Sequence, residues 1–253
     1  MSTLERVYGM YAVRALLTRH PARVRRVLLQ SGRGDARGAE IEALARTRGC
    51  TLERADAARL KNLVGEVVHQ GVVAEVETLA PWREEQLLAA LEQVQDPLLL
   101  ALDGVQDPHN LGACLRTADA CGALAVIVPR DRAAPLNATV RKVAAGAAET
   151  TPVVTVTNLS RTLQLLKQAG CWIVGAAGEA ERPAQQVDLT GPRVIVMGAE
   201  GHGLRELTRR HCDWLARLPS LGAVESLNVS VATGMMLYEA LRQRSAPAAT
   251  NKK

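Results

Sequence analysis

"PLLLALDGVQDPHNLGACLRTAD", residues 97–119, indicates the fold class of this chain. Its first six residues are an apolar run, and a polar turn then leads into a stretch with helical spacing. Further apolar runs bounded by turn residues follow at 123–129, 151–156, 171–177 and 193–198. Such runs are typical of parallel strands covered on both faces, so the sequence predicts an α/β domain with a parallel sheet.

Helices are expected between these runs, at 110–121, 137–148, 158–169 and 204–211. Regular alternation of strand and helix predicts an open sheet, and ligands of such sheets bind beyond the carboxyl ends of the strands. Functional residues are therefore expected in the loops that follow the strands.

The first third of the chain predicts a smaller α/β unit over residues 1–77. Its expected elements are a helix, a strand, a second helix and a half-buried strand, at 7–20, 24–30, 38–49 and 71–77. Residues 78–96 are polar around one short helical pattern and are expected to form a linker. The second domain then spans 97–244, and residues 245–253 are expected to be a disordered tail.

The charge balance is basic, with a formal net charge of +5. Residues 1–80 hold 13 Lys and Arg against 9 Asp and Glu. This surplus fits either a solvated surface or a module that binds nucleic-acid phosphates. With three Trp, three Tyr and no Phe, a platform of aromatic residues that stacks on bases is disfavoured.

The five cysteines are scattered and form no C-x-x-C pair. This favours reduced thiols in a cytoplasmic protein, with neither a disulfide framework nor a zinc site. The sequence has no apolar run near the roughly 20 residues that span a bilayer and no secretory signal, so no membrane partner is expected.

The first candidate loop, residues 102–119, places Asn110 where a helix N-cap is expected. Arg116 follows one to two turns later. Its simplest role is a surface ion pair with Asp119, three residues along the same helix.

The second loop, residues 197–204, has three glycines around Glu200. Glycines let the backbone approach a ligand closely. Their spacing matches neither a phosphate-binding loop nor the dinucleotide fingerprint, which argues against a nucleotide-dependent oxidoreductase. The simplest role of Glu200 is to cap the helix predicted at 204–211.

The third segment, residues 217–234, contains Ser226, Asn228 and Ser230 at the start of a very apolar helix. One N-cap needs only one such residue, so the others are candidates for chemistry. The helix has almost no polar side over its first three turns, whereas a lone surface helix shows one apolar stripe. We therefore expect it to be covered on two sides.

Taken together, these segments resemble a known family. "NLGACLRTA", "VMGAEGHGL" and "VESLNVSVATGMMLYE" are similar, in order and spacing, to the three motifs of the SpoU-type ribose 2′-O-methyltransferases. The resemblance runs from Val7 to about Arg244. Within the family, the chain is most similar to the bacterial enzymes that modify a guanosine of large-subunit (23S) rRNA.

The resemblance implies a deep trefoil knot in the second domain and a ribosomal-protein-like RNA-binding domain over residues 1–77. It also implies a homodimer and S-adenosylmethionine as cofactor. No metal is expected, because the methyl group of this cofactor is already a strong electrophile and the chain offers no metal-ligand spacing. Two alternatives stay open: 2′-O-methylation of another rRNA or tRNA nucleotide, and a non-catalytic RNA-binding protein.

The resemblance also implies the site residues. Those carried over to the active site are Asn110, Arg116, Glu200, Ser226 and Asn228, and those carried over to the cofactor site are Gly198, Gly201, Leu218 and Leu227. Arg116 is expected to hold a phosphate, and direct proton acceptance by it stays open. His109 and His202 are not favoured as bases. Many relatives read Ile-Pro-Met where this chain reads Leu218-Pro219-Ser220, so Ser220 replaces a large apolar side chain near the cofactor.

Overall fold

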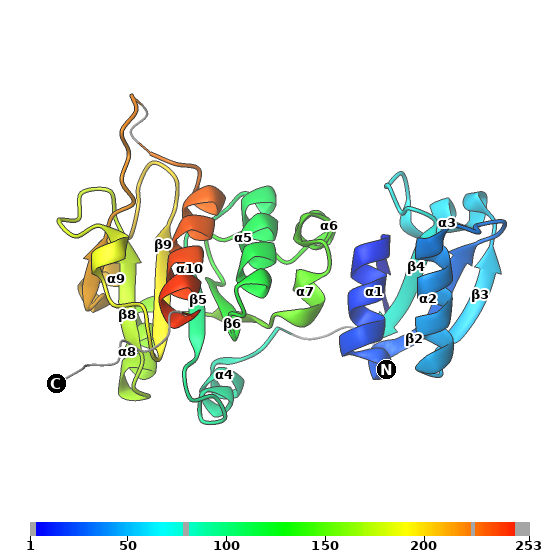
Figure 1. Cartoon of the computed structure of the whole chain (residues 1–253), viewed down its shortest axis with the longest axis horizontal. Helices are drawn as coiled ribbons and strands as arrows, with labels where there is room; N and C mark the ends of the chain where they lie inside the picture. The colour runs from blue at the N-terminus through cyan, green and yellow to red at the C-terminus, as the bar shows by residue number, and fades with distance from the viewer. Residues whose placement is uncertain (1–3, 78–80, 224–225, 246–253) are drawn as a thin grey trace. The chain divides into compact units, whose positions relative to one another are not determined.

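The computed structural model describes residues 4–77, 81–223 and 226–245, which divide into two compact units. One unit holds the residues before 81 together with 136–150, and the other holds the remainder (Figure 1). Ser245 is the last residue of the C-terminal helix. The rest of the predicted tail, 246–253, lies outside the described residues.

The first unit is built on a four-stranded sheet with the order β1-β4-β2-β3. β4 is antiparallel to both of its neighbours, whereas β2 and β3 are parallel. The strands are β1 (Leu4–Tyr8), β2 (Val24–Gln30), β3 (Thr51–Ala55) and β4 (Val72–Glu77). The helices are α1 (Met10–Arg19), α2 (Ala36–Thr47), α3 (Ala57–Val64), α6 (Ala138–Ala144) and α7 (Ala147–Thr150), with a 3-10 turn, η1 (Pro21–Arg23).

Two predictions for this unit are wrong in detail. Val7 belongs to β1 and not to a helix, because Gly9 with φ 94° separates the strand from α1. β4 is buried on both faces: Val72 packs in the core formed with α1 and α2, and Val73 packs with Leu60 of α3. The sequence pattern predicted burial of only one face of β4, because it did not indicate that α3 covers the other face.

The second unit is built on a six-stranded sheet with the order β10-β8-β9-β5-β6-β7, and all neighbouring strands are parallel. The strands are β5 (Leu98–Asp103), β6 (Ala125–Pro129), β7 (Val153–Val156), β8 (Trp172–Ala176), β9 (Arg193–Gly198) and β10 (Trp214–Ala216). The five predicted apolar runs are thus confirmed as strands of a parallel sheet. β10, with three residues at the sheet edge, was not predicted.

Helices cover this sheet. They are α4 (Glu84–Leu91), α5 (Pro108–Ala120), α8 (Leu159–Gln168), α9 (Glu206–His211) and α10 (Val229–Ser245), with a 3-10 turn, η2 (Ala184–Gln186). α4 and α8 contribute leucines to a core that includes Leu99, Ile127 and Val196 of the sheet. α5 and α10 lie side by side (Figure 1), and α10 also contacts β9.

Two predicted segments have a different structure. Residues 84–91 of the expected linker form α4, whose Leu87 and Leu91 are buried in the second unit's core. The helix predicted at 137–148 is divided into α6 and α7, because Ala145 and Gly146 adopt positive φ values of 52° and 103°. In the described residues, no helix combines the length and apolar character needed to cross a membrane.

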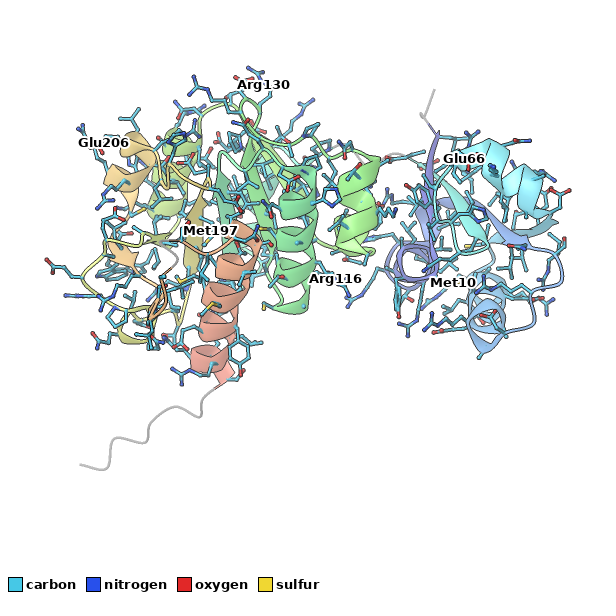
Figure 2. The ribbon with its side chains drawn as sticks, turned by 90° about the horizontal axis from the view of Figure 1, so that it is seen from above. Met10, Glu66, Arg116, Arg130, Met197 and Glu206 are labelled. Carbon is cyan, nitrogen blue, oxygen red and sulfur yellow. The ribbon has the colours of Figure 1, made fainter. Side chains whose placement is uncertain are left out.

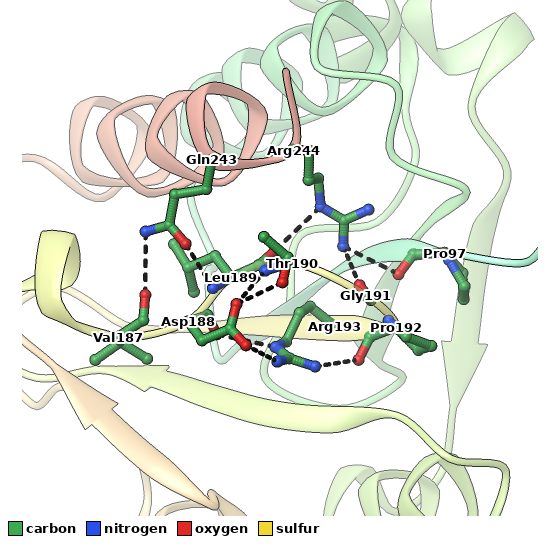
Figure 3. Close-up of polar contacts among 10 residues, drawn as sticks. All are labelled: Pro97, Val187, Asp188, Leu189, Thr190, Gly191, Pro192, Arg193, Gln243 and Arg244. Carbon is green, nitrogen blue, oxygen red and sulfur yellow. Dashed lines mark hydrogen bonds and ion pairs between the residues drawn. The ribbon is translucent and has the colours of Figure 1, made fainter. Parts of the chain in front are cut away.

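The C-terminal end of α10 is fixed by side-chain bonds to backbone groups (Figure 3). The Arg244 guanidinium donates to the carbonyl oxygens of Leu189 at 3.1 Å and Asp96 at 2.8 Å, and also to those of Pro97 and Gly191. Burial lowers the pKa of Arg244. One side chain thus joins the end of α10 to the segments that enter β5 and β9.

We predict that Arg244→Ala destabilises the protein by about 1–3 kcal/mol, because carbonyl oxygens lose their donor in a half-buried position. Urea unfolding followed by circular dichroism measures the effect. The matched control is Arg242→Ala, since the exposed Arg242 side chain pairs, among the described residues, with Glu239 of the same helix and does not join α10 to another segment. Equal unfolding midpoints for the two variants would contradict the role assigned to Arg244.

Candidate active site

A cavity of about 470 Å³ lies where the loops after β8, β9 and β10 meet the start of α10. The sheet's strands end at this edge, as the parallel topology predicts. All four residues expected to bind the cofactor line the cavity: Gly198, Gly201, Leu218 and Leu227. Ser226 and Ser220 also line it, so the departure at Ser220 falls in the cavity wall.

The glycine loop between β9 and α9 is closed by backbone packing. A Cβ on Gly198 would lie 2.1 Å from the carbonyl carbon of Gly203, so no side chain fits there. The Gly203 amide donates to the carbonyl oxygen of Ala199 at 2.9 Å, and Gly201 and Gly203 have φ values of 79° and 63°. Glycine tolerates these left-handed conformations without strain. The result is a tight turn that contains Glu200.

Glu200 joins the three candidate segments. Its Oε1 accepts hydrogen bonds from the Asn228 side-chain amide at 2.8 Å, the Val229 backbone amide at 3.1 Å and the Asn110 side-chain amide at 3.3 Å. The Asn228 side chain also donates to Asn110 Oδ1 at 2.9 Å. Glu200 therefore contacts the start of α10 and does not cap α9, which begins at Glu206 after Arg205.

The N-cap of α5 is Asp107 and not Asn110, so that prediction is wrong. The Asp107 side chain accepts from the backbone amides of His109 and Asn110, and Pro108 takes the first helical position, where a missing N–H costs nothing. Because Asp107 supplies the cap, the Asn110 side chain is left to bond Glu200 and Asn228.

Asn228 is the residue that caps α10. Its Oδ1 accepts from the backbone amides of Ser230 at 2.9 Å and Val231 at 3.3 Å, and from the Ser230 hydroxyl at 2.6 Å. The three polar residues at this helix start thus differ in role. Asn228 caps and bridges, Ser230 holds Asn228 in place, and Ser226 faces the cavity.

Arg116 extends from α5 as an exposed side chain (Figure 2). In the described part of the chain it makes no hydrogen bond or ion pair, whereas Asp119 accepts from Thr151 at 3.0 Å. The structure therefore brings together Asn110, Glu200 and Asn228 but joins Arg116 to none of them by a hydrogen bond or ion pair.

The loop after β8 forms a cavity wall that the sequence did not reveal. Its residues Ala177 to Glu179 line the cavity together with Ala176 at the end of β8, and the sequence signals this wall only by a run of small residues after a strand. The Arg209 guanidinium bonds the Glu179 carboxylate and lowers its pKa, so Glu179 is charged at neutral pH. Within the described residues, no group of three His, Cys, Asp or Glu is arranged to hold a metal ion.

The fold is that of a class of methyltransferases. Residues 97–238 match the model of the SpoU rRNA methylase family, and residues 6–82 match that of the RNA 2′-O ribose methyltransferase substrate-binding domain. The chain belongs to the SpoU rRNA methylase family, as the sequence motifs indicated.

Its relatives include proteins named 23S rRNA (guanosine-2′-O-)-methyltransferase RlmB. That of Pseudomonas syringae pv. tomato is 59% identical over 97% of this chain and 98% of its own length. That of Escherichia coli K12 is 50% identical over 95% and 99%. Among solved structures, an AdoMet-bound rRNA methyltransferase from Sinorhizobium meliloti has a TM-score of 0.72 and 25% identity, covering 94% of this chain and 87% of that one.

We predict that Asn228→Asp keeps α10 capped but abolishes methyl transfer above neutral pH. The new carboxylate retains the acceptor for the helix amides, yet it faces Glu200 across a contact that is 2.8 Å in the native protein. Like charges raise the pKa of one carboxyl group. Below that raised pKa, one proton is shared between the new carboxyl group and Glu200, and the hydrogen bond between the two side chains is restored. Activity should therefore return in part as the pH falls.

The measurement is a pH profile of methyl transfer, with circular dichroism as the folding check. Ser230→Ala is the matched control, because it removes a neutral donor to the same Asn228 oxygen. A flat profile for Asn228→Asp, parallel to that of Ser230→Ala, would show that the contact with Glu200 is unimportant.

Proposed function

We propose that this protein transfers the methyl group of S-adenosylmethionine to the ribose 2′-hydroxyl of a guanosine in 23S rRNA. The observation that carries this function is the junction at Glu200, where the three motif segments meet beside the cavity. The relatives that match almost the whole chain carry this activity in their names.

The cavity fits S-adenosylmethionine in size and in chemistry. Sites for ligands of this class measure about 300–1,000 Å³ and combine apolar walls with a few polar groups. Met197, Leu218 and Val229 supply apolar surface, and Glu179 and Glu200 supply negative charge for a cationic ligand. When bound, the cofactor supplies an electrophilic methyl group on a sulfonium sulfur.

The residues of the junction orient the acceptor hydroxyl. Glu200 Oε1 is occupied by its three donors, whereas its Oε2 makes no hydrogen bond in the described chain and can accept one from the substrate. Holding two reacting groups in line contributes about 7–11 kcal/mol to such a reaction. Asn110, Glu200, Ser226 and Asn228 therefore act mainly by alignment.

Arg116 holds a phosphate of the RNA next to the methylated nucleotide. A guanidinium has a planar fork that matches phosphate geometry, and it keeps its charge at any physiological pH. Its exposure and its lack of a partner in the described chain support this role. A lysine retains the charge but loses the fork.

We predict that Arg116→Ala lowers kcat for methyl transfer about 100-fold, on the order of the loss caused by misplacing a reacting group, with AdoMet affinity unchanged. The kcat of Arg116→Lys should lie between that of Arg116→Ala and that of the native enzyme. Initial rates with rRNA and calorimetry with AdoMet separate the two effects. Arg161→Ala, a similarly exposed arginine on α8, serves as the control and should leave kcat unchanged.

The experiment that tests the function maps 2′-O-methylation across all rRNA and tRNA in a strain that lacks the gene. We expect one 23S guanosine to lose its methyl group, and the native gene, but not Arg116→Ala, to restore it. Loss at another rRNA or tRNA nucleotide would favour the broader methyltransferase alternative. An unchanged map would leave only RNA binding.

Residues 1–77 are proposed to bind the rRNA substrate, in the cytoplasm where ribosomes are made. The match to the substrate-binding model and the basic surplus of this segment support the assignment. The second domain, 97–244, is proposed to carry the trefoil knot. Support comes from the path of the chain, which reaches the sheet edge at β10 and returns to pack α10 against α5 and β9.

The protein is also proposed to be a homodimer that associates through α10. One face of this helix is buried within the subunit, including Met236 and Leu237 at 0% exposure. The opposite face carries large apolar side chains that stay exposed: Val231, Met235, Tyr238 and Leu241. Their spacing of three to four residues makes one stripe, which is the second covered side expected from the sequence.

We predict that Tyr238→Glu converts the dimer to a folded monomer, because it places a charge in an apolar contact that only a second copy would cover. Sedimentation velocity gives the association state, and circular dichroism confirms the fold. Met236→Glu is the contrasting variant and should unfold the subunit. A dimeric Tyr238→Glu protein with native spectra would place the interface elsewhere.

A further inference from the structure

Asp103 is a buried carboxylate outside the set of residues that the motifs single out. It is the last residue of β5, and only 1% of its surface is exposed. In the sheet it lies opposite Gly198, the last residue of β9 and the first of the glycine loop. Its backbone position therefore fixes the start of that loop.

The side chain of Asp103 holds the end of the same loop. Arg205, the residue directly before α9, donates its backbone amide to Asp103 Oδ2 at 2.9 Å and its Nε to Oδ1 at 2.5 Å. The Arg205 Nη2 pairs with the same Oδ1. The two oxygens of one carboxylate thus bond the backbone and the side chain of one residue.

Both ends of the loop consequently meet at Asp103, with Glu200 between them. The turn is closed inside by the bond from the Gly203 amide to the Ala199 carbonyl, so it has little freedom of its own. Moving Arg205 would therefore shift the segment that carries Glu200. The three hydrogen bonds to Glu200 Oε1 depend on that segment's position.

If Asp103 served only to stabilise the fold, an apolar residue at this position would do so at a lower cost in desolvation free energy. Burying a charge costs free energy that its partner only partly restores, and such pairs often stabilise a protein less than packed apolar side chains do. What a charge-assisted pair adds is a defined geometry. That geometry is useful where a reacting group must be placed within a fraction of an ångström.

We infer that Asp103 is a positioning residue for methyl transfer, acting through Glu200, and that Arg205 is its partner. The inference rests on the proposed function for its kinetic consequence. The carboxylate fixes the loop between Gly198 and Arg205, and the loop holds Glu200 against Asn110 and Asn228. Neither Asp103 nor Arg205 needs to touch the substrate or the cofactor.

The test is a double-mutant cycle between Asp103→Asn and Glu200→Ala in the full-length protein. Asn keeps the shape of Asp but turns one acceptor into a donor that faces Arg205. We expect Asp103→Asn alone to lower kcat about 10- to 100-fold, as a misplaced group does. In the Glu200→Ala background, Asp103→Asn should lower kcat less than about twofold, because the side chain through which Asp103 acts has been removed.

Hydrogen exchange of peptides covering 199–204 and 228–232 is the second readout. Asp103→Asn should speed exchange in both, since the loop and the start of α10 are joined at Glu200. Arg205→Ala should give the same pattern and replaces Asp103→Asn if that variant does not fold. Arg210→Ala, which breaks an exposed pair with Glu206 on the same helix, is the control and should change neither readout.

The outcomes separate the two hypotheses. If native protein does not methylate 23S rRNA, the proposed function fails, and the exchange data still decide whether Asp103 positions Glu200. If native protein is active but Asp103→Asn costs the same factor with and without Glu200, the inference is wrong. A lowered unfolding midpoint with unchanged kcat and unchanged exchange at 228–232 would also overturn it.

Discussion

A single oxygen atom, Glu200 Oε1, connects the three segments that form the candidate active site. It accepts bonds from Asn110 after β5 and from Asn228 and Val229 at the start of α10. Segments that are 90 and 28 residues away from Glu200 are thereby held at one point. The three hydrogen bonds form together only when all three donors are in position. The geometry of the site therefore depends on the correct folding of the sheet edge from which these segments emerge.

The sheet provides that integrity through its parallel order. Because neighbouring strands are parallel, the loops after β5, β8, β9 and β10 emerge at one edge, where the cavity lies. The loop after β9 can turn tightly only because Gly198 has no side chain to strike Gly203. The geometry of the site is thus set by backbone packing as much as by the polar side chains.

α10 is held at both ends by different means. At its start, Asn228 caps the helix and bonds Glu200, and at its end Arg244 bonds four backbone carbonyls. Between them, one face is buried and the other presents an exposed apolar stripe. A helix anchored in this way can carry the proposed subunit contact without losing its place beside the candidate active site.

The sequence by itself determined the parallel sheet and the residues of the junction. The run at 97–102 is apolar throughout, and the run at 193–198 is apolar after Arg193, because both sheet faces are covered; that signal is local. The motif resemblance named Asn110, Glu200 and Asn228. Only the tertiary structure decided three other features. These are the cap of α5 by Asp107, the break between α6 and α7 at Ala145, and the pairing of Asp103 with Arg205. Each of these features depends on which backbone groups lack a hydrogen-bond partner or on which distant side chains come into contact. The spacing of residues along the sequence indicates neither.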